Sequence, residues 1–284
     1  MRHRTATVAI SSGILAAALV ASAGMRRQGD DLEQAEALAS LLQSRAIDLT
    51  HTFDDQTIYW PKDKHFCHER TQWGETEGGT GWYASATYSA SEHGGTHLDS
   101  PIHFAEGQAT TDQISIDRLI GPAVVVDVTE ACRADRDYQL QTADLMAWES
   151  RHGRIPDRAI VLVRTGFGAF WPDKNQYLGT DKPGDVANLH FPGIGPEAAR
   201  WLVAERSLSG IGLDTASLDH GPSQDFAAHR ILNGAGLFGL ENVANLDQLP
   251  EAGAVILAFP MKIGGGSGGP TRIVALLPEP RDGD

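Results

Sequence analysis

Cysteine is scarce in this chain, with two residues among 284. Neither Cys67 nor Cys132 has the spacing to other ligands that is typical of a zinc site. Sequence alone gives no reason to place the two thiols within bonding distance of each other. We therefore expect two free thiols and no zinc held by cysteine.

Positive charge is also in short supply. The chain has 23 Lys and Arg against 37 Asp and Glu, a net charge of −14 at pH 7. This balance argues against nucleic acid or an anionic membrane surface as a partner. Internal repeats are absent, and the composition does not shift in the middle of the chain. With 41% hydrophobic and 21% charged residues, we expect an ordinary globular protein with one domain.

A long apolar run occurs only at the N-terminus. Arg2 and Arg4 precede an apolar run over 8–20, and the small-residue pattern ASA follows at 21–23. This order is typical of a secretory signal peptide, and the run is short for a full membrane span. We predict a signal peptide over 1–23 and an exported protein, periplasmic or secreted. The alternative is an uncleaved N-terminus that anchors the chain in a membrane.

The remaining sequence mixes the periodicities of helices and strands. Apolar residues at helical spacing over 31–46 predict an N-terminal helical segment, 24–46, and two further helices are predicted at 142–153 and 196–207. Runs rich in β-branched residues predict strands buried on both faces at 122–128 and 159–165. Further strands are expected at 47–61, 210–219, 237–243, 254–263 and 272–278, and loops with a hairpin over a pocket at 65–88. This order predicts a mixed α/β fold with a substantial β core.

The main functional signal is the stretch SEHGGTHLDSPIHF at 91–104. His93, His97, Asp99 and His103 share odd positions, so an extended chain would direct all four to one face. Extension alone would separate the first histidine and the aspartate by about 20 Å, but the Gly-Gly pair and the proline between them permit bends. Imidazoles with a carboxylate suit zinc, manganese or iron, and three protein ligands leave the open position typical of a catalytic metal.

Two further candidate ligands lie later in the chain. A helix is predicted from a cap at Ser223 to Gly234, with His229 on its apolar face. Glu241 falls on the apolar face of the strand predicted at 237–243, where a carboxylate needs a cation or several donors to stay charged. Each residue alone is more often structural. Together with the cluster at 93–103, both become candidate ligands of the same metal or of a second one.

These residues resemble a known family. HGGTHLDSPIHF resembles the H-x-G-T-H-x-D-x-P-x-H-F signature of the cyclase family of bacterial metal-dependent hydrolases, which includes kynurenine formamidase and isatin hydrolase. DLTHTFDDQTIYWP, LHFPGI, GLDTASLDHGPSQDFAAHR and LENVANLDQLP look like the same family, so the resemblance extends from about residue 47 to residue 278. It implies a compact domain over 47–284 with a barrel-like β core and surrounding helices, forming a homo-oligomer, either a dimer or a tetramer.

The resemblance also implies roles for individual residues. It implies five metal ligands, namely His93, His97, Asp99, His229 and Glu241. Asp99 would bridge to a second ion in the two-zinc members, whereas isatin hydrolase-like members use one manganese. The implied cofactor is therefore zinc or manganese, as one ion or two, and His103 would be the proton shuttle.

The expected activity is hydrolysis of a C–N bond in a small aromatic amide or lactam, similar to N-formylkynurenine or isatin. A divalent cation lowers the pKa of bound water to about 7, and a histidine beside it titrates in the range that is useful for protonating the leaving nitrogen. Trp60 and Phe66 are expected to stack on a flat substrate.

Three other readings have some support. GGSGG at 265–269 meets the G-x-S-x-G pattern, but no histidine follows Ser267, so we expect a mobile loop beside the pocket, or a plain flexible turn, rather than a serine nucleophile. His97, Asp99 and His229 are also the residue types of the facial triad of iron oxygenases, in which two histidines and one carboxylate bind the iron. An exported protein that binds a metal or a metabolite without turnover is the third alternative; a pure binder has no use for His103 as a spare base.

Overall fold

A closed β-barrel forms the centre of the fold. The computed structural model describes residues 45–277. Seven strands pair in the order β12-β11-β5-β7-β9-β10-β4, and β4 closes the barrel by pairing with β12. Their bounds are β4 His97–Asp99, β5 Ile120–Asp127, β7 Ile160–Arg164, β9 Gly210–Leu213, β10 Phe238–Glu241, β11 Ala252–Pro260 and β12 Gly268–Leu277. The predicted mixed α/β fold with a barrel-like core is confirmed.

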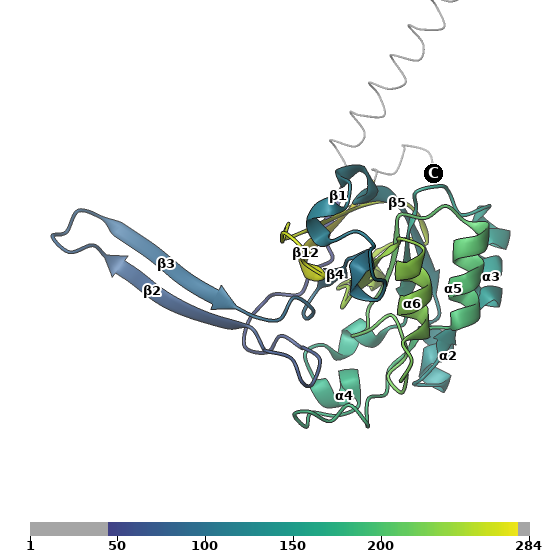
Figure 1. Ribbon diagram of the computed structural model, residues 1–284, viewed down its shortest axis with the longest axis horizontal. Coiled ribbons are helices and arrows are strands. Elements are labelled where there is room, and N and C mark those ends of the chain that lie inside the picture. Colours follow the sequence, from purple (N-terminus) through teal and green to yellow (C-terminus); the bar gives the residue numbers. More distant parts are fainter. Residues whose placement is uncertain (1–44, 278–284) are drawn as a thin grey trace, which may run out of the picture. The chain divides into compact units, whose positions relative to one another are not determined.

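Strands β5 and β7 are buried on both faces over most of their length, as predicted. Val125 and Leu162 pack in the cluster that fills the barrel, whereas Val124 and Val161 pack in a second cluster outside it. Besides α4 Lys174–Leu178, which contributes Tyr177 and Leu178, four helices contribute to this outer cluster and cover that side of the barrel (Figure 1): α2 Thr129–Ala134, α3 Thr142–His152, α5 Pro196–Glu205 and α6 Ala227–Gly234. The parallel strands β5, β7, β9 and β10 therefore lie between two apolar layers.

Short elements complete the unit. β1 Arg45–Asp48 lies outside the barrel beside β12. The others are α4 Lys174–Leu178, the pair β6 Gln139–Leu140 and β8 Gly193–Ile194, and the 3-10 helices η1 Pro101–His103, η2 Thr111–Gln113, η3 Ile116–Arg118, η4 Phe167–Phe170 and η5 Leu246–Gln248.

The predicted hairpin is present, but it projects from the barrel and its residues do not line the pocket of the candidate site described below. It consists of β2 Cys67–Glu75 and β3 Trp82–Ser89, which pair only with each other and extend away from the barrel (Figure 1). Both strands are exposed along most of their length. Its aromatic side chains Trp73, Trp82, Tyr83 and Tyr88 are each at least half exposed.

Several predicted boundaries differ from the structure. The strand expected at 47–61 covers only the end of β1; beyond it, Asp54 and Thr57 form a turn through their mutual backbone and side-chain hydrogen bonds. The strand expected at 210–219 ends at Leu213. The helix expected from Ser223 begins at Ala227, because the Ser223 hydroxyl accepts from the backbone of Phe226 and forms a turn ahead of the helix.

The predicted N-terminal features lie outside the described residues. The signal peptide over 1–23 and most of the helical segment 24–46 belong to this part, while residues 45 and 46 belong to β1 rather than to a helix. Within residues 45–277, no helix is both long and apolar enough to cross a membrane. Cys67 is exposed and Cys132 is buried, and both are free thiols, as expected.

Candidate metal centre

Strands β4 and β10 place three of the predicted ligands side by side. Leu98 points into the barrel, so His97 and Asp99 on either side of it point out of the barrel. β10 runs antiparallel to β4 and sets Glu241 opposite His97 and Gly239 opposite Asp99. A Cβ on Gly239 would lie 3.2 Å from Oδ2 of Asp99, so this glycine leaves room for the carboxylate.

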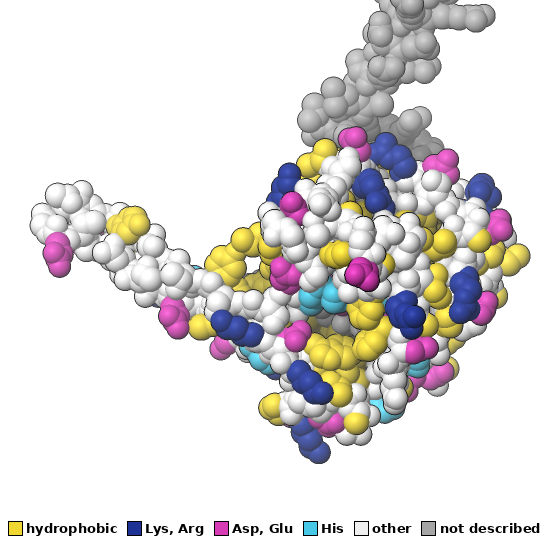
Figure 2. All heavy atoms as spheres, viewed as in Figure 1, with side chains coloured by type: hydrophobic (Ala, Val, Ile, Leu, Met, Phe, Trp, Pro, Cys, Tyr) yellow, Lys and Arg dark blue, Asp and Glu magenta, His cyan; other side chains and the backbone are white. Residues whose placement is uncertain are grey.

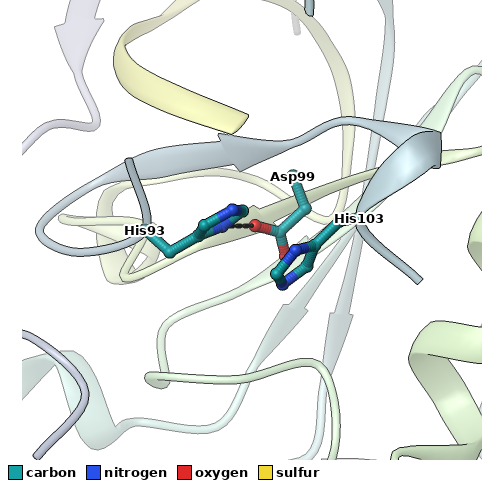
Figure 3. A group of neighbouring side chains, drawn as sticks. All are labelled: His93, Asp99 and His103. Carbon is teal, nitrogen blue, oxygen red and sulfur yellow. Dashed lines mark hydrogen bonds and ion pairs between the residues drawn. The ribbon is translucent and has the colours of Figure 1, made fainter. Parts of the chain in front are cut away.

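Two bends bring the remaining histidines of the cluster to Asp99. Gly95 has φ +58°, and the chain turns back so that Nδ1 of His93 lies 2.6 Å from Oδ1 of Asp99. Pro101 then begins η1, which returns His103 to the same place. The rings of His93 and His103 stack with their centroids 3.8 Å apart (Figure 3). The chain thus folds back at both predicted points.

Helix α6 supplies His229. Its Nε2 atom lies 3.3 Å from Oδ2 of Asp99 and 3.1 Å from Oε1 of Glu241. Its other ring nitrogen, Nδ1, lies 2.7 Å from Oδ2 of Asp219. The other four predicted ligands and His103 therefore lie around the carboxylate of Asp99.

The residues present fit a divalent cation. His97 Nε2 is buried and has no hydrogen-bond partner within residues 45–277, although it lies 3.2 Å from Asp99 Oδ1 and 3.4 Å from Glu241 Oε2. Two groups of three residues could each hold an ion, and within each group the ligand atoms lie within 4.8 Å of one another. The groups are His93, Asp99 and His103, and His97, Asp99 and Glu241, so Asp99 belongs to both. Two carboxylates and several imidazoles buried together are the ligand types that zinc or manganese binds.

The electrostatics of the cluster depend on burial and on Asp99. Burial lowers the pKa of His103 to about 4, so this ring is neutral at pH 7. For His97, burial acts to lower the pKa, but the charges of Asp99 and Glu241 prevail and raise the pKa to about 9. Burial and the charge of Asp99 raise the pKa of Glu241. Two buried carboxylates in contact thus require positive charge nearby.

A second layer of contacts was not predicted from the sequence. His93 Nε2 lies 2.9 Å from the hydroxyl of Ser267, and that hydroxyl lies 2.6 Å from Oε2 of Glu92. Ser267 belongs to the glycine tract that was expected to be a mobile loop beside the pocket. Part of the tract is strand instead, because Gly268 pairs with Asp99 across β12 and β4. A Cβ on Gly268 would meet Cε1 of His93 at 2.6 Å.

The cluster forms the floor of a pocket of about 310 Å³. His93, His97, His103, His229 and Glu241 all line it. Figure 2 shows histidine side chains at the surface beside a hollow with hydrophobic side chains. The structure therefore places the candidate ligands where a small molecule can reach them.

Aromatic rings form one wall of the pocket. Trp60 lines it as expected, together with Phe104 and Phe226, whose ring centroids are 5.3 Å apart. Phe66 does not line this pocket. It packs instead against Phe53 and Tyr88 at the base of the hairpin, with centroid distances of 5.8 and 5.9 Å.

Comparisons with known proteins agree with this geometry. The model of the family described as "Putative cyclase" matches residues 47–220. An isatin hydrolase from Roseibium aggregatum is 38% identical over 197 residues, which cover 66% of this chain and 73% of the relative. A kynurenine formamidase from Geobacillus thermodenitrificans is 30% identical over 227 residues, which cover 80% of this chain and 94% of the relative.

Solved structures show the same relationship. Isatin hydrolase A from Labrenzia aggregata, bound to benzyl benzoate, aligns with a TM-score of 0.76 at 34% identity and covers 89% of this chain and 100% of its own. An isatin hydrolase bound to the product analogue thioisatinate aligns with a TM-score of 0.77 at 29% identity, and the alignment covers 88% of this chain and 99% of that structure's chain. The family match, which spans more than half of the chain, and these relatives show that the chain belongs to the cyclase family.

Proposed function

We propose that the protein is a metal-dependent hydrolase that cleaves the C–N bond of a small aromatic amide or lactam. One observation carries this proposal: Asp99 and Glu241 are both buried and lie within 3.4 Å of ring nitrogens of His97 and His229, beneath an open pocket that Glu241 and both histidines line. Buried carboxylates without a neutralising arginine or lysine are unfavourable unless a cation joins them. The names of the relatives, isatin hydrolase and kynurenine formamidase, support amide hydrolysis as the use of that cation.

The proposed ligands are those at the pocket floor. His97, Asp99 and Glu241 would hold one ion, and His229 and His93 complete the group around it. The ion would be zinc or manganese, with Asp99 shared if two ions bind. A divalent cation held there lowers the pKa of the water it binds and polarises a carbonyl group.

His103 is the proposed proton carrier. Hydrolysis adds a hydroxyl group to the carbonyl carbon and a proton to the nitrogen, so one proton must travel from water to the leaving nitrogen. The His103 ring lines the pocket and stacks on His93, within reach of both the metal ligands and a bound substrate. Being neutral, it can accept the proton at one nitrogen and return it to the substrate.

The shape of the pocket favours a flat, aromatic substrate. Trp60, Phe104 and Phe226 present ring surfaces above the polar floor. An aromatic ring is stabilised by stacking on such side chains, while its amide or lactam carbonyl faces the histidines. An isatin-like lactam and an N-formylkynurenine-like amide both meet this description.

The test is a pair of hydrolysis assays on metal-loaded protein, one with isatin and one with N-formylkynurenine, each with and without oxygen. We expect hydrolysis of at least one compound at equal rates in both atmospheres. Oxygen-dependent turnover would favour the alternative of an iron oxygenase. Metal binding without turnover of either compound would favour a binding protein, or a different substrate class.

We also propose that the protein is a homo-oligomer. The hairpin of β2 and β3 exposes Trp73, Trp82 and Tyr83, and an isolated two-stranded hairpin is only marginally stable in water. A second copy of the chain would cover these rings. The molar mass in solution, measured by light scattering, tests this; deletion of residues 70–86 should yield monomers, and a monomeric wild type would contradict it.

A further inference from the structure

A second cavity, of about 750 Å³, lies apart from the residues of the metal centre. Residues that directly follow β5, β7 and β9 line it, including Thr129, Thr165 and Asp214. These three strands are parallel, so their carboxyl ends meet at one edge of the sheet. Ligands of α/β sheets commonly bind at this edge.

Arg164 is the first unusual feature of this cavity. It is the last residue of β7, it lines the cavity, and its side chain is only 15% exposed. Its Nε atom lies 3.3 Å from Oδ2 of Asp127 but makes no hydrogen bond, and the rest of the guanidinium donates to no residue within 45–277. The buried Nε–H group therefore has an ion pair with Asp127 but no hydrogen-bond acceptor among the residues that the structure describes, and the two terminal amino groups are left to bind a ligand that enters the cavity. The cavity is where such an acceptor can enter.

Arg136 adds a second positive charge. Its guanidinium lies over the ring of Phe167, 4.9 Å from the centroid, and donates to the carbonyl oxygens of His190, at 2.8 Å, and of Gln176. These neutral acceptors hold the group in place without removing its charge. The adjacent carboxylate, Asp137, is bound to His190 at 2.7 Å.

His51 provides another unused polar atom. Its ring stacks on Trp171 with centroids 4.1 Å apart, and its buried Nε2 has no hydrogen-bond partner in the described part of the chain. The ring also lines the cavity. Unused nitrogens of Arg164 and His51 thus belong to side chains around the same space.

The acidic residues that line the cavity accept no hydrogen bond from Arg164 or His51. Both oxygens of Asp214 accept from the loop at 165–168, with two bonds from Thr165, one from Gly166 and one from Gly168. Asp247 is exposed at the rim. Arg133, also at the rim, forms its ion pair with Glu130 outside the cavity.

We propose that this cavity binds a small aromatic carboxylate. The carboxylate would be held by Arg164 and Arg136, because the planar guanidinium matches the two oxygens of a carboxylate. The ring would pack on apolar side chains that also line the cavity, which are Phe167, Phe170 and Leu246. An inorganic oxyanion such as phosphate would leave this apolar wall uncovered. The proposal does not depend on the activity at the metal centre.

The test uses 4-bromobenzoate as the probe. Crystals of the metal-loaded protein are soaked with it, and the anomalous signal of bromine locates each bound molecule, which separates this cavity from the metal pocket. We expect a bromine peak in this cavity with the carboxylate at Arg164. Bromine at the metal pocket alone, or nowhere, would overturn the proposal.

Calorimetric titration of variants supplies the second readout. Arg164→Met should weaken binding at this site by about tenfold, the usual loss for a charged hydrogen bond. The matched control Arg133→Met removes a rim arginine with its own partner and should leave the affinity within about twofold. Because Arg164 is largely buried, thermal unfolding checks that its variant folds. Should it fail to fold, Arg136→Met decides, again with about a tenfold loss expected. Unchanged affinity in the arginine variants, or tighter binding of inorganic phosphate than of 4-bromobenzoate, would contradict the assignment.

Discussion

Asp219 fixes both the ring and the backbone of His229. Its Oδ2 lies 2.7 Å from Nδ1 and 3.1 Å from the backbone nitrogen of His229, and its Oδ1 accepts from the backbone of Ala228 at 2.8 Å. The carboxylate of Asp219 therefore accepts hydrogen bonds from two backbone N–H groups in the first turn of α6 and also orients the imidazole of His229. Because Nδ1 donates to Asp219, Nε2 is left facing Asp99 and Glu241, as a metal ligand requires.

Asp219→Asn should weaken metal binding. The amide is close in size to the carboxylate but is a poorer acceptor for the Nδ1 proton, so the ring orientation and basicity of His229 are less well maintained. We expect a loss of about 10- to 100-fold in metal affinity, measured by competition with a chelator of known affinity. Asp225→Asn, in the exposed turn before the same helix, is the control and should leave the affinity unchanged.

Ser267→Ala should lower activity without unfolding the protein. The serine hydroxyl accepts from His93 Nε2 and donates to Glu92, so its removal frees the His93 ring to turn. We expect kcat/KM to fall about tenfold, with the melting temperature within a few degrees of that of the wild type. Ser150→Ala, an exposed helix position, serves for comparison. An unaltered kcat/KM would mean that Ser267 does not position His93.

Gly264 and Gly268, on either side of Ser267 in the chain, should respond differently to substitution. A Cβ at Gly268 would lie 2.6 Å from Cε1 of His93 and 2.7 Å from the carbonyl of Leu98, whereas one at Gly264 would meet nothing within 4 Å. Gly268→Ala should therefore lower the free energy of unfolding by about 1–3 kcal/mol and displace His93. Gly264→Ala should change neither stability nor activity. Urea unfolding compares the two, and equal stabilities would contradict the close packing of β12 against His93.

His51 should make the fold sensitive to acid. Burial lowers the pKa of its ring from 6.5 to about 4, so between these values the unfolded chain binds a proton that the folded chain does not. The stabilisation is complete above pH 6.5 and is lost as the pH falls from there to about 4. After allowance for the partly exposed ring, the contribution is on the order of 2 kcal/mol. His51→Phe keeps the stacking on Trp171 but cannot titrate, so its free energy of unfolding should fall less between pH 7 and pH 5.

The candidate metal centre was predictable where it depended on local spacing. Odd positions placed His97 and Asp99 on one face of a strand, and the glycine pair indicated the bend before them. His229 and Glu241 were recognised because each was a polar residue on an apolar face. Glu92 and Ser267 were missed because their contact joins segments 175 residues apart, and local patterns carry no information on such contacts. Asp219 lies only 10 residues from His229, but irregular turns separate the two, so no helix or strand periodicity related them.

The fold was likewise predictable where it depended on local sequence and not where it depended on distant contacts or on turns. The buried strands β5 and β7 were recognisable from continuous β-branched runs, since both of their faces are covered. The segment from 49 to 61 was expected to be strand but forms turns, because the side chains of Asp54 and Thr57 satisfy its backbone locally. Phe66 was assigned to the pocket from its residue type, whereas the direction of the hairpin carries it elsewhere.

Metal content and turnover measured together test the central claim, that the buried carboxylates hold a divalent cation which hydrolysis requires. Purified wild-type protein, a chelated sample, the chelated sample with zinc or manganese restored, and Asp99→Asn are compared by elemental analysis and by hydrolysis of isatin and N-formylkynurenine. We expect one or two ions per chain in the wild type, loss of activity on chelation, recovery on restoring the metal, and neither metal nor activity in Asp99→Asn. Full hydrolysis by metal-free protein, or by Asp99→Asn, would contradict it.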